Sequence, residues 1–541
     1  MPNLPVRGLG SAGVITDVSP YDLPIGAWSN SRNVRFEGDA VTRASVFKPF
    51  ILSQDFTASP PIYVVDDTLR GTSKSISTLR ANGTITRVAD GVISDVSPSP
   101  ALSTTTENVT GTTIGSVSYI NNAIDPPVSY TNSETRYSTI PHWPTGYRCK
   151  SLRSYGDFLI AINLSNTIGN FPNSIRWSDA VQVGTRPKWA LGEENSLAGD
   201  NVLNGSSGFL IDGFELGSMF VIYGSHEVFA MNYVGAPFIF EFRKLFSNFS
   251  IMTQNCVVEV NSMHFVFCED DIVNTDGGSY QSICNARTRK AIFSRIDYSK
   301  RENCRVIHNS LKSEILFCYA SNAGEAAWLP NELGCNEAAV YNYANDTWSF
   351  IDLPNVICGT EVMHPIGAVE EASTWEGIAI AWDESNDSWS FTTASPMTLV
   401  LATKGDDNTV PGKLYFYDDA QGGRIGNAAD TNVFWQAWSE MTLHDFDSLG
   451  ISITSAKLVK SFAPQVITEN ENQYVTYYIK AEPLNTSVTN WTDPFTYNPY
   501  FSHIIDTRIS GRYISLRYEI PEQTVAKFSG FDIDVMKISG R

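Results

Sequence analysis

One six-residue pattern occurs twice in the chain, and its spacing constrains the fold more than any other sequence feature. Residues 345–350 read Asn-Asp-Thr-Trp-Ser-Phe, and residues 386–391 read Asn-Asp-Ser-Trp-Ser-Phe, a displacement of 389 − 348 = 41 residues. Each copy follows an alternating strand-like segment, and Asn and Asp tolerate the left-handed angles of a tight hairpin. A repeat of about 40–50 residues is the length of a four-stranded propeller blade. Because any β-meander uses such turns, a β-sandwich stays open, and the spacing favours a β-propeller.

Composition extends the strand signal to the rest of the chain. Charged residues make up only 18%, aromatic residues 12%, and there are 38 Gly and 26 Pro, as is typical of strands and turns. No window carries a sustained apolar stripe of helical period, and only residues 285–294 are compatible with a short helix. At 541 residues the chain needs several domains or one large repetitive domain. We therefore expect an all-β protein.

The strength of the strand pattern divides the chain. Residues 58–132 are rich in Ser, Thr, Asn and Gly and predict thin, exposed β-hairpins, with a long loop or disorder as the alternative for residues 97–113. From about Tyr147 the apolar runs strengthen and recur at blade-like intervals. After about residue 403 longer alternating strands predict a separate antiparallel sheet with one buried and one wet face.

The charge balance argues against a protein that grips phosphates. Lys and Arg total 38 and Asp and Glu total 58, which gives a formal charge of −20. Affinity for nucleic acid comes largely from Lys and Arg, so an acidic chain is more compatible with DNA that passes without adhering. The N-terminus has no apolar core of signal-peptide length, and no apolar run approaches the ~18 residues of a membrane span. These features predict a soluble protein made in a cytoplasm.

The eight cysteines never form a CxxC pair, so a zinc ribbon or a thioredoxin-like site is not expected. Several lie inside apolar strands, as Cys268 and Cys318 do, where a free cysteine behaves as a small hydrophobic residue. The sequence therefore predicts reduced thiols in the core rather than disulfides.

Catalytic signatures such as HExxH, GxSxG and GxxxxGK[ST] are missing from the sequence, and we expect no GxGxxG after a strand. Only residues 444–447, His-Asp-Phe-Asp, cluster ligand-type side chains, and a polar loop is the preferred interpretation because a metal needs three or more convergent ligands. Residues 269–271 with Asp276, and residues 383–384 with Asp387, depart from the calcium-loop pattern and are better explained as hairpin-turn carboxylates. Paired carboxylates for glycoside cleavage stay open, although no pair stands out. We expect no catalytic, cofactor-binding or metal-binding residues.

We expect the aromatic residues to pack in the core and the basic residues to be solvated. Five tryptophans lie where β-units begin or end, so packing is favoured over stacking on a glycan or a base: Trp143, Trp177, Trp189, Trp348 and Trp389. The most basic stretch, residues 287–290, predicts a solvated turn.

A succession of short segments along almost the whole chain resembles one protein family. The segments are residues 21–24, 28–30, 33–36, 155–159, 175–179, 233–237, 265–267, 269–272, 345–350, 353–354, 511–514 and 530–535. In this order they resemble the tail nozzle (tail tube, tail tubular) proteins of short-tailed bacteriophages, the podoviruses. Residues 58–132 match the family pattern least.

The resemblance implies a non-enzymatic virion structural protein of the viral tail, assembled in the bacterial host cytoplasm. Family members form a homo-oligomeric ring, usually a hexamer, below the portal and adaptor proteins. They close the DNA channel and conduct the genome during DNA ejection. The implied partners are further copies of the chain, the adaptor and portal, tail fibres, and double-stranded DNA that passes without specific binding; no cofactor and no membrane span are implied.

The resemblance also assigns the domains. Residues 1–57 become the N-terminal β-segment of a platform domain, residues 58–402 a β-propeller with weakly patterned first blades at 58–146, and residues 403–541 the C-terminal platform sheet. Loops near residues 97–113 and 193–207 are candidates for gates that block the bore.

Six copies would carry 6 × −20 = −120 charges, and an acidic wall would keep outgoing DNA from adhering. The alternative function is a glycan-binding or glycan-cleaving β-propeller of a tail spike or cell surface, with aromatics and turn carboxylates in a central funnel. A Kelch-like scaffold is a third, which the missing Kelch glycine pairs disfavour.

Overall fold

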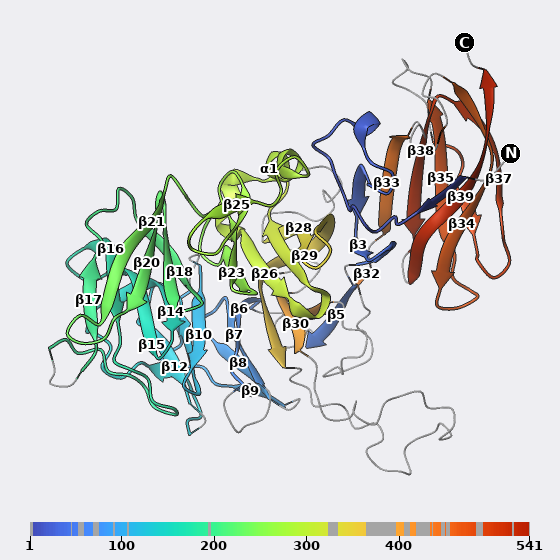
Figure 1. The fold of residues 1–541 in the computed structure, drawn as a ribbon. Helices are drawn as coiled ribbons and strands as arrows, with labels where there is room; N and C mark the ends of the chain where they lie inside the picture. The colour runs from blue at the N-terminus through green and yellow to red at the C-terminus, as the bar shows by residue number, and fades with distance from the viewer. Residues whose placement is uncertain are drawn as a thin grey trace, which may run out of the picture.

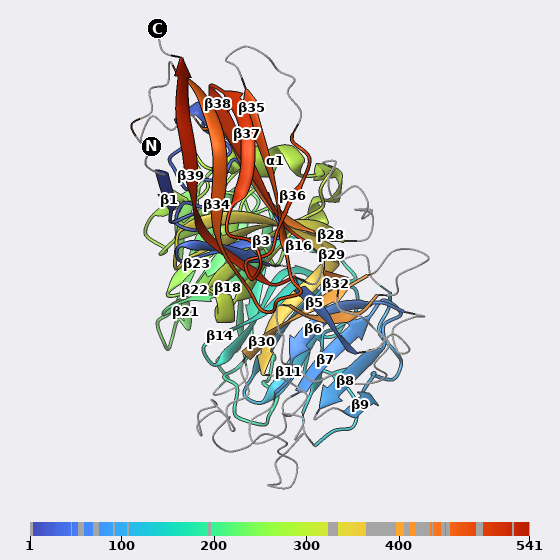
Figure 2. The same cartoon turned by 90° about the vertical axis from the view of Figure 1, so that its right-hand side faces the viewer.

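The structure, a computed structural model, is built almost wholly of antiparallel strands (Figures 1 and 2). The residues it describes are 4–44, 46–51, 59–68, 75–89, 92–104, 108–131, 133–192, 196–322, 334–363, 397–404, 412–417, 433–434, 436–444, 450, 455–482, 491–521 and 524–539. The expected all-β class is confirmed at this level.

Five consecutive segments each fold into a four-stranded antiparallel sheet whose strands pair in chain order. The first two sheets are β6 (Pro61–Asp66), β7 (Ser75–Arg80), β8 (Ile85–Ala89) and β9 (Val92–Asp95), then β10 (Thr110–Ile114), β11 (Val117–Asn121), β12 (Val128–Tyr130) and β13 (Ser138–Thr139). The third is β14 (Arg148–Tyr155), β15 (Phe158–Ser165), β16 (Asn170–Trp177) and β17 (Gly199–Val202). The fourth and fifth are β18 (Leu210–Leu216), β19 (Met219–Gly224), β20 (Glu227–Tyr233) and β21 (Phe240–Ser247), then β22 (Val257–Val260), β23 (Met263–Phe267), β24 (Ile272–Thr275) and β25 (Tyr280–Ser282).

An eight-stranded sheet follows, and it joins distant parts of the chain. In spatial order it contains β26 (Arg305–Asn309), β27 (Glu314–Tyr319), β28 (Cys335–Asn342), β29 (Thr347–Met363), β30 (Met397–Thr403), β31 (Leu414–Tyr417), β5 (Val46–Ile51) and β32 (Val433–Phe434). The long strand β29 pairs with β28 through its first half and with β30 through its second half, with a register shift near Val356. Strand β5 comes from the N-terminal segment and pairs antiparallel with β31.

The first strands of these six sheets and the long strand β29 contact one another in a closed circle. Strand β6 contacts β10, and the contacts continue through β14, β18, β22, β26 and β29, which in turn contacts β6. Apolar side chains fill the spaces between neighbouring sheets, as where Tyr119 packs near Leu152 and Tyr223 near Val266. Each sheet therefore buries both faces against its two neighbours.

The described residues of 58–132 take part in this packing, which corrects one expectation. The hairpins form as expected, but Ile76, Leu79, Ile85 and Val88 are buried, so the segment is not thin and exposed. The short apolar runs of this segment form a core because neighbouring sheets cover them with a second apolar face. The local sequence does not reveal these neighbours.

The hairpin at residues 345–350 forms as its sequence predicts. Strand β28 turns into β29 across residues 343–346, where Asp346 adopts a φ of 54°. Trp348 is buried and packs against Phe317 and Tyr341. The second copy of the pattern, residues 386–391, lies outside the described residues.

The C-terminal strands form a two-layer sandwich with help from the N-terminal segment, seen in red and dark blue in Figures 1 and 2. One sheet runs β3 (Val34–Glu37), β4 (Ala40–Arg43), β39 (Ala526–Ser539), β34 (Ala456–Thr468) and β37 (Ile505–Gly511), with β1 (Leu4–Arg7) also on β39. The other runs β2 (Asn30–Arg32), β33 (Ala437–His444), β38 (Tyr513–Ile520), β35 (Val475–Glu482) and β36 (Phe495–Tyr497). Aromatic rings join the layers: Phe462 meets Tyr477 at 5.1 Å and Tyr518 meets Phe528 at 4.6 Å between centroids.

Residues 1–57 are thus shared between two bodies. Strands β1 to β4 join the sandwich, whereas β5 joins the eight-stranded sheet. This pairing differs from the assignment of residues 1–57 to a platform alone, and β31 extends the circular arrangement beyond residue 402. Pairing across hundreds of residues is invisible to local sequence patterns.

Helix is scarce in the described part of the chain. The single-turn and short elements are α1 (Arg289–Arg295), η1 (Pro20–Asp22), η3 (Tyr298–Asn303) and η4 (Ser310–Lys312), and α1 confirms the helix expected near residues 285–294. Among these residues no helix has the length and apolar character needed to cross a membrane. All eight cysteines are buried and free, which confirms the expected core thiols.

Candidate functional site

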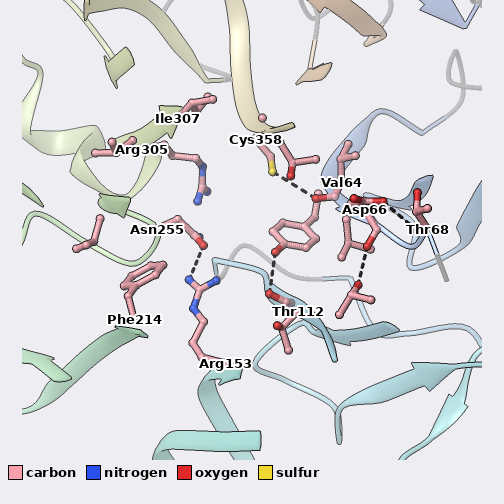
Figure 3. A pocket seen from close by; sticks show the side chains of 18 residues that line it. Val64, Asp66, Thr68, Thr112, Arg153, Phe214, Asn255, Arg305, Ile307 and Cys358 are labelled. Atoms are coloured by element: carbon pink, nitrogen blue, oxygen red, sulfur yellow. Dashed lines mark hydrogen bonds between the residues drawn. The ribbon is translucent and has the colours of Figure 1, made fainter. Parts of the chain in front are cut away.

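A polar cavity of about 500 Å³ lies inside the circle of first strands. Each of β6, β10, β14, β18, β22, β26 and β29 contributes lining residues, either from the strand itself or from the residues beside it. Figure 3 shows Arg153 and Arg305 pointing toward the same part of the cavity as Asn255, with Asp66 and Thr68 on another side. Successive strand residues face opposite ways, so each inner strand presents only a few side chains to this space.

Arg153 is held by a complete set of partners. Its Nη2 lies 2.6 Å from Asp212 Oδ2, its Nε donates to Asp212 Oδ1 at 2.9 Å, and Nη2 also donates to Asn255 Oδ1 at 2.7 Å. Asp212 is fully buried, and its carboxylate also accepts from the backbone N–H of Asn255 at 2.9 Å. Burial alone would raise the pKa of Asp212, but Arg153 and these hydrogen bonds outweigh it and lower the pKa. The pair is a fixed, neutralised part of the wall.

Arg305 differs from Arg153 because it has no acidic partner. Only 7% of the residue is exposed, and Nη2 donates to Asn108 Oδ1 at 2.6 Å. Its Nε is buried with no hydrogen-bond partner, and no carboxylate among the described residues forms an ion pair with it. Asn108 in turn donates to Thr253 Oγ1 at 3.0 Å, so neutral groups alone orient the guanidinium. A buried charge without a counter-ion is costly, which makes Arg305 the exceptional residue of this wall.

Burial raises the pKa of each of the remaining titratable groups of the cavity. Burial raises the pKa of the Tyr63 phenol and of the Cys358 thiol. Burial also raises the pKa of Asp66, against the opposing hydrogen bond from Thr68 N at 2.9 Å. A protonated thiol is a weak nucleophile. The geometry is therefore suited to binding through Arg305 rather than to nucleophilic chemistry at Cys358.

The cavity continues toward the surface. A second space of about 480 Å³ shares Gly111, Thr112, Arg153 and Phe214 with the first. Its outer lining includes the exposed residues Glu215, Gly217 and Ser262, and also Glu259. A small molecule therefore has a path from solvent to the inner wall.

The acidic residues singled out in the sequence serve local structure where they are described. Asp276 Oδ1 accepts from the N–H groups of Gly278 and Ser279, both at 2.8 Å, as a turn carboxylate does. Asp271 accepts from the Ser282 hydroxyl at 2.8 Å. Residues 383–384 and Asp387 lie outside the described residues, as do residues 445–447 and the side chain of His444. In the described ranges no group of three or more His, Cys, Asp or Glu side chains is arranged to hold a metal ion.

The basic stretch at residues 287–290 forms surface ion pairs. Arg287 Nη2 lies 2.7 Å from Asp346 Oδ2, and Thr288 is buried at the start of α1. Arg289 lies 3.6 Å from Asp270. Residues 287–288 form a turn that leads into α1, and partly exposed ion pairs tie this turn and α1 to two hairpin turns.

The described tryptophans pack as predicted. Trp177, Trp189 and Trp348 are buried, and Trp143 packs edge-on against Trp189 with centroids 4.7 Å apart. None of these four lines the central cavity. Trp389 lies outside the described residues.

The segments named as gate candidates have mixed structure. Of residues 97–113, the last four belong to β10, Leu102 and Val109 are buried, and Asn108 holds Arg305. Of residues 193–207, the first three lie outside the described residues and 199–202 form β17. A gating role for either segment stays a prediction.

The sequence did not single out Arg153, Arg305 or Asn255. One signal was available for Arg305, a charged residue between the apolar residues Cys304 and Val306 at the start of a strand. A charge at a strand position that faces inward indicates a buried polar contact or a site. The convergence of seven strands, however, depends on pairings across about 300 residues and has no local signal.

Comparison with known proteins gives a limited result. No family model matches the chain, and no curated protein sequence matches it. A solved structure that matches is PorZ, an essential bacterial surface component of the type-IX secretion system of Porphyromonas gingivalis. The match has a TM-score of 0.35 and 8% identity, and it covers 73% of this chain and 43% of PorZ, less than half of that protein.

Proposed function

We propose that the chain is a structural subunit of the tail nozzle of a short-tailed bacteriophage. In this proposal several copies, six by analogy with the family, form a ring below the adaptor and portal, close the DNA channel, and conduct the genome on infection. The protein resides in the virion tail after assembly in the bacterial host cytoplasm. Tail fibres dock on it, and double-stranded DNA passes through without specific binding.

Within this proposal the circular part is a seven-bladed β-propeller. Its blades are the five four-stranded sheets, a sixth made by β26, β27, β28 and the first half of β29, and a seventh made by the second half of β29 with β30, β31 and β5. The circle of contacts that ends where β29 meets β6 supports this assignment. The pairing of β5 with β31 would then tie the N-terminal segment into the last blade. The C-terminal sandwich is the platform.

One observation carries the proposal: a single N-terminal segment is built into both bodies. Strands β1 to β4 complete the two sheets of the sandwich, and β5, three residues after β4, completes the other body. The bodies cannot move apart without breaking strand pairing on one side. Domains in one chain ordinarily move relative to each other unless their interface is extensive. A wall that retains packaged DNA needs this rigidity, whereas a simple binding module does not.

Buried ion pairs reinforce the junction between the two bodies. Arg32 Nη1 from β2 lies 2.7 Å from Glu337 Oε1 in β28, and Arg35 Nη2 from β3 donates to Glu314 Oε2 in β27 at 2.9 Å. The side chain of Glu337 is fully buried and also meets Arg295 Nη1 at 2.8 Å. Such paired charges demand one relative placement of the two bodies, because any shift leaves a buried charge uncompensated.

The net charge also supports the proposal. Six copies would carry 6 × −20 = −120 charges, and acidic groups facing a bore would repel DNA phosphates. A bore that is neutral or basic in the assembled ring would contradict this part of the proposal.

Assembly tests the function. Purified full-length protein mixed with its tail adaptor should form a ring whose nozzle portion has a mass of 6 × 59.7 kDa, about 358 kDa, by mass photometry. The protein without adaptor is the control, and the same preparation should leave bacterial surface polysaccharide intact. Persistent monomers with adaptor would contradict the nozzle, and depolymerisation of polysaccharide would favour the glycan-cleaving alternative.

A further inference from the structure

We propose that the central cavity is a binding site for a small oxyanion, a phosphate or carboxylate group, and that Arg305 is the residue that binds it. This inference goes beyond the nozzle function and does not depend on it. It stands on the cavity and on the exceptional state of one buried guanidinium.

The two arginines of the wall separate structure from binding. Arg153 is neutralised by Asp212 through two contacts, at 2.6 and 2.9 Å. Arg305 is more than nine-tenths buried, lines the same cavity, and has Asn108 as its hydrogen-bond acceptor. A guanidinium presents five donors in a rigid fork that matches the oxygens of phosphate or carboxylate.

Hydrogen bonds orient the side chain of Arg305 but leave its charge without a counter-ion among the described residues. Arg305 donates to Asn108, Asn108 donates to Thr253 at 3.0 Å, and Thr253 donates to the carboxylate of Glu302 at 2.9 Å, so two neutral side chains separate the guanidinium from this acid. Glu302 lies at the surface, with 66% of its side chain exposed, and does not contact the guanidinium. Asn108 and Thr253 therefore fix the orientation of Arg305 without cancelling its charge. A ligand anion would supply the missing counter-charge.

Size and access limit the ligand to a small molecule. The inner cavity has about 500 Å³, and the adjoining space of about 480 Å³ connects it to exposed residues. Glu215 and Glu259 line that outer space, so bulky polyanions such as DNA are repelled at the entrance. Phosphate and small carboxylates satisfy both limits.

Calorimetric titration of the full-length protein tests the proposal, with inorganic phosphate and malonate as separate probes and sodium chloride at matched ionic strength as reference. At least one probe should bind the wild-type protein beyond the chloride reference, and the choice distinguishes phosphate from carboxylate ligands. R305M should weaken that binding at least tenfold, and R305K, which keeps the charge but loses the fork, should weaken it less. The matched control R301M changes an arginine with 48% of its side chain exposed and should bind within twofold of wild type.

Binding of either probe that R305M removes and R301M retains supports the site. Failure of both probes to bind wild type, or undiminished binding by R305M, overturns it. If R305M does not fold, as judged by near-ultraviolet circular dichroism, R305K decides, and binding equal to wild type in R305K overturns the role of the guanidinium fork.

Discussion

The junction between the two bodies and the central cavity both contain buried arginines paired with carboxylates, but the cavity also holds Arg305, which has no carboxylate partner among the described residues. At the junction, the side chain of Arg32 is 6% exposed and reaches two carboxylates, those of Glu337 and Asp352. In the cavity, Arg305 is equally buried and reaches none in the described residues. A buried ion pair fixes the geometry of its two partners and contributes little net free energy to folding. An unpaired buried charge lowers the free energy of unfolding, and a bound anion would offset that loss. The contrast separates groups that hold the fold from a group that is available for binding.

The largest expected effect comes from breaking the junction. Glu337→Gln leaves Arg32 and Arg295 without a shared carboxylate, so the free energy of unfolding should fall by about 3–5 kcal/mol. Urea denaturation measures the change. The control Asp346→Asn removes the exposed partner of Arg287 and should cost less than about 1 kcal/mol. Equal effects of the two substitutions would remove the distinction between paired core and surface charges.

The Arg153–Asp212 pair in the cavity wall gives a second measure of what an unpaired buried arginine costs. Asp212→Asn leaves Arg153 buried without a counter-charge and should cost about 3 kcal/mol in the same urea experiment. A cost below about 1 kcal/mol would mean that the pair does not fix the wall. Asp200→Asn, at an exposed position of strand β17, serves as the aspartate control.

Acid should weaken the junction by protonating Glu337. The pKa of Glu337 is lowered from 4.5 to about 2, because Arg32 and Arg295 outweigh the opposing effect of burial. A carboxyl whose pKa is lower in the folded than in the unfolded chain stabilises the fold at pH values above its unfolded pKa. This stabilisation is lost as pH falls from about 5 toward 2. Unfolding free energy measured across this window should decline in wild type and decline less in Glu337→Gln. Parallel curves would contradict the assignment.

A buried histidine extends the acid response to milder pH. Burial lowers the pKa of His264 from 6.5 to about 4, while its ring contacts the Tyr223 hydroxyl at 2.8 Å and the Glu215 carbonyl at 2.7 Å. The unfolded chain binds a proton below pH 6.5 and the folded chain resists it, so stability falls between pH 6.5 and 4. His264→Gln should flatten this part of the curve relative to His226→Gln, in which the exposed histidine is changed.

The smallest expected effect is the most informative one for the cavity. Arg305→Met removes one hydrogen bond to Asn108 and also an uncompensated charge, so these effects oppose and stability should change by about 1 kcal/mol or less. Urea denaturation without phosphate or malonate measures it. A loss of 3 kcal/mol or more would place Arg305 with Arg153, as a group that the fold requires.

Much of the local structure was predictable from the sequence because it depends on near neighbours. The hairpin at residues 345–350 needs only an Asp that accepts a positive φ and a Trp that packs, and both are observed at Asp346 and Trp348. The alternating pattern of residues 530–535 likewise gives strand β39. Periodicity of two residues is sufficient for both predictions.

Long-range pairing was not predictable from the same patterns. Strand β5 joins β31 across more than 360 residues, and nothing local distinguishes it from β1 to β4, which join the sandwich. The buried hairpins of residues 58–132 obtain their core from neighbouring sheets. Arg305 and Asn108 meet across 197 residues, so the cavity appears only once the chain is folded.

A single-particle electron-microscopy reconstruction of the protein assembled with its adaptor tests the central proposal most directly. The account predicts a closed ring of six copies around a bore whose facing side chains are mainly acidic, with the sandwich and the circular body of each copy held in the relative placement described here. A monomer, an open filament, or a ring with a basic bore would contradict it.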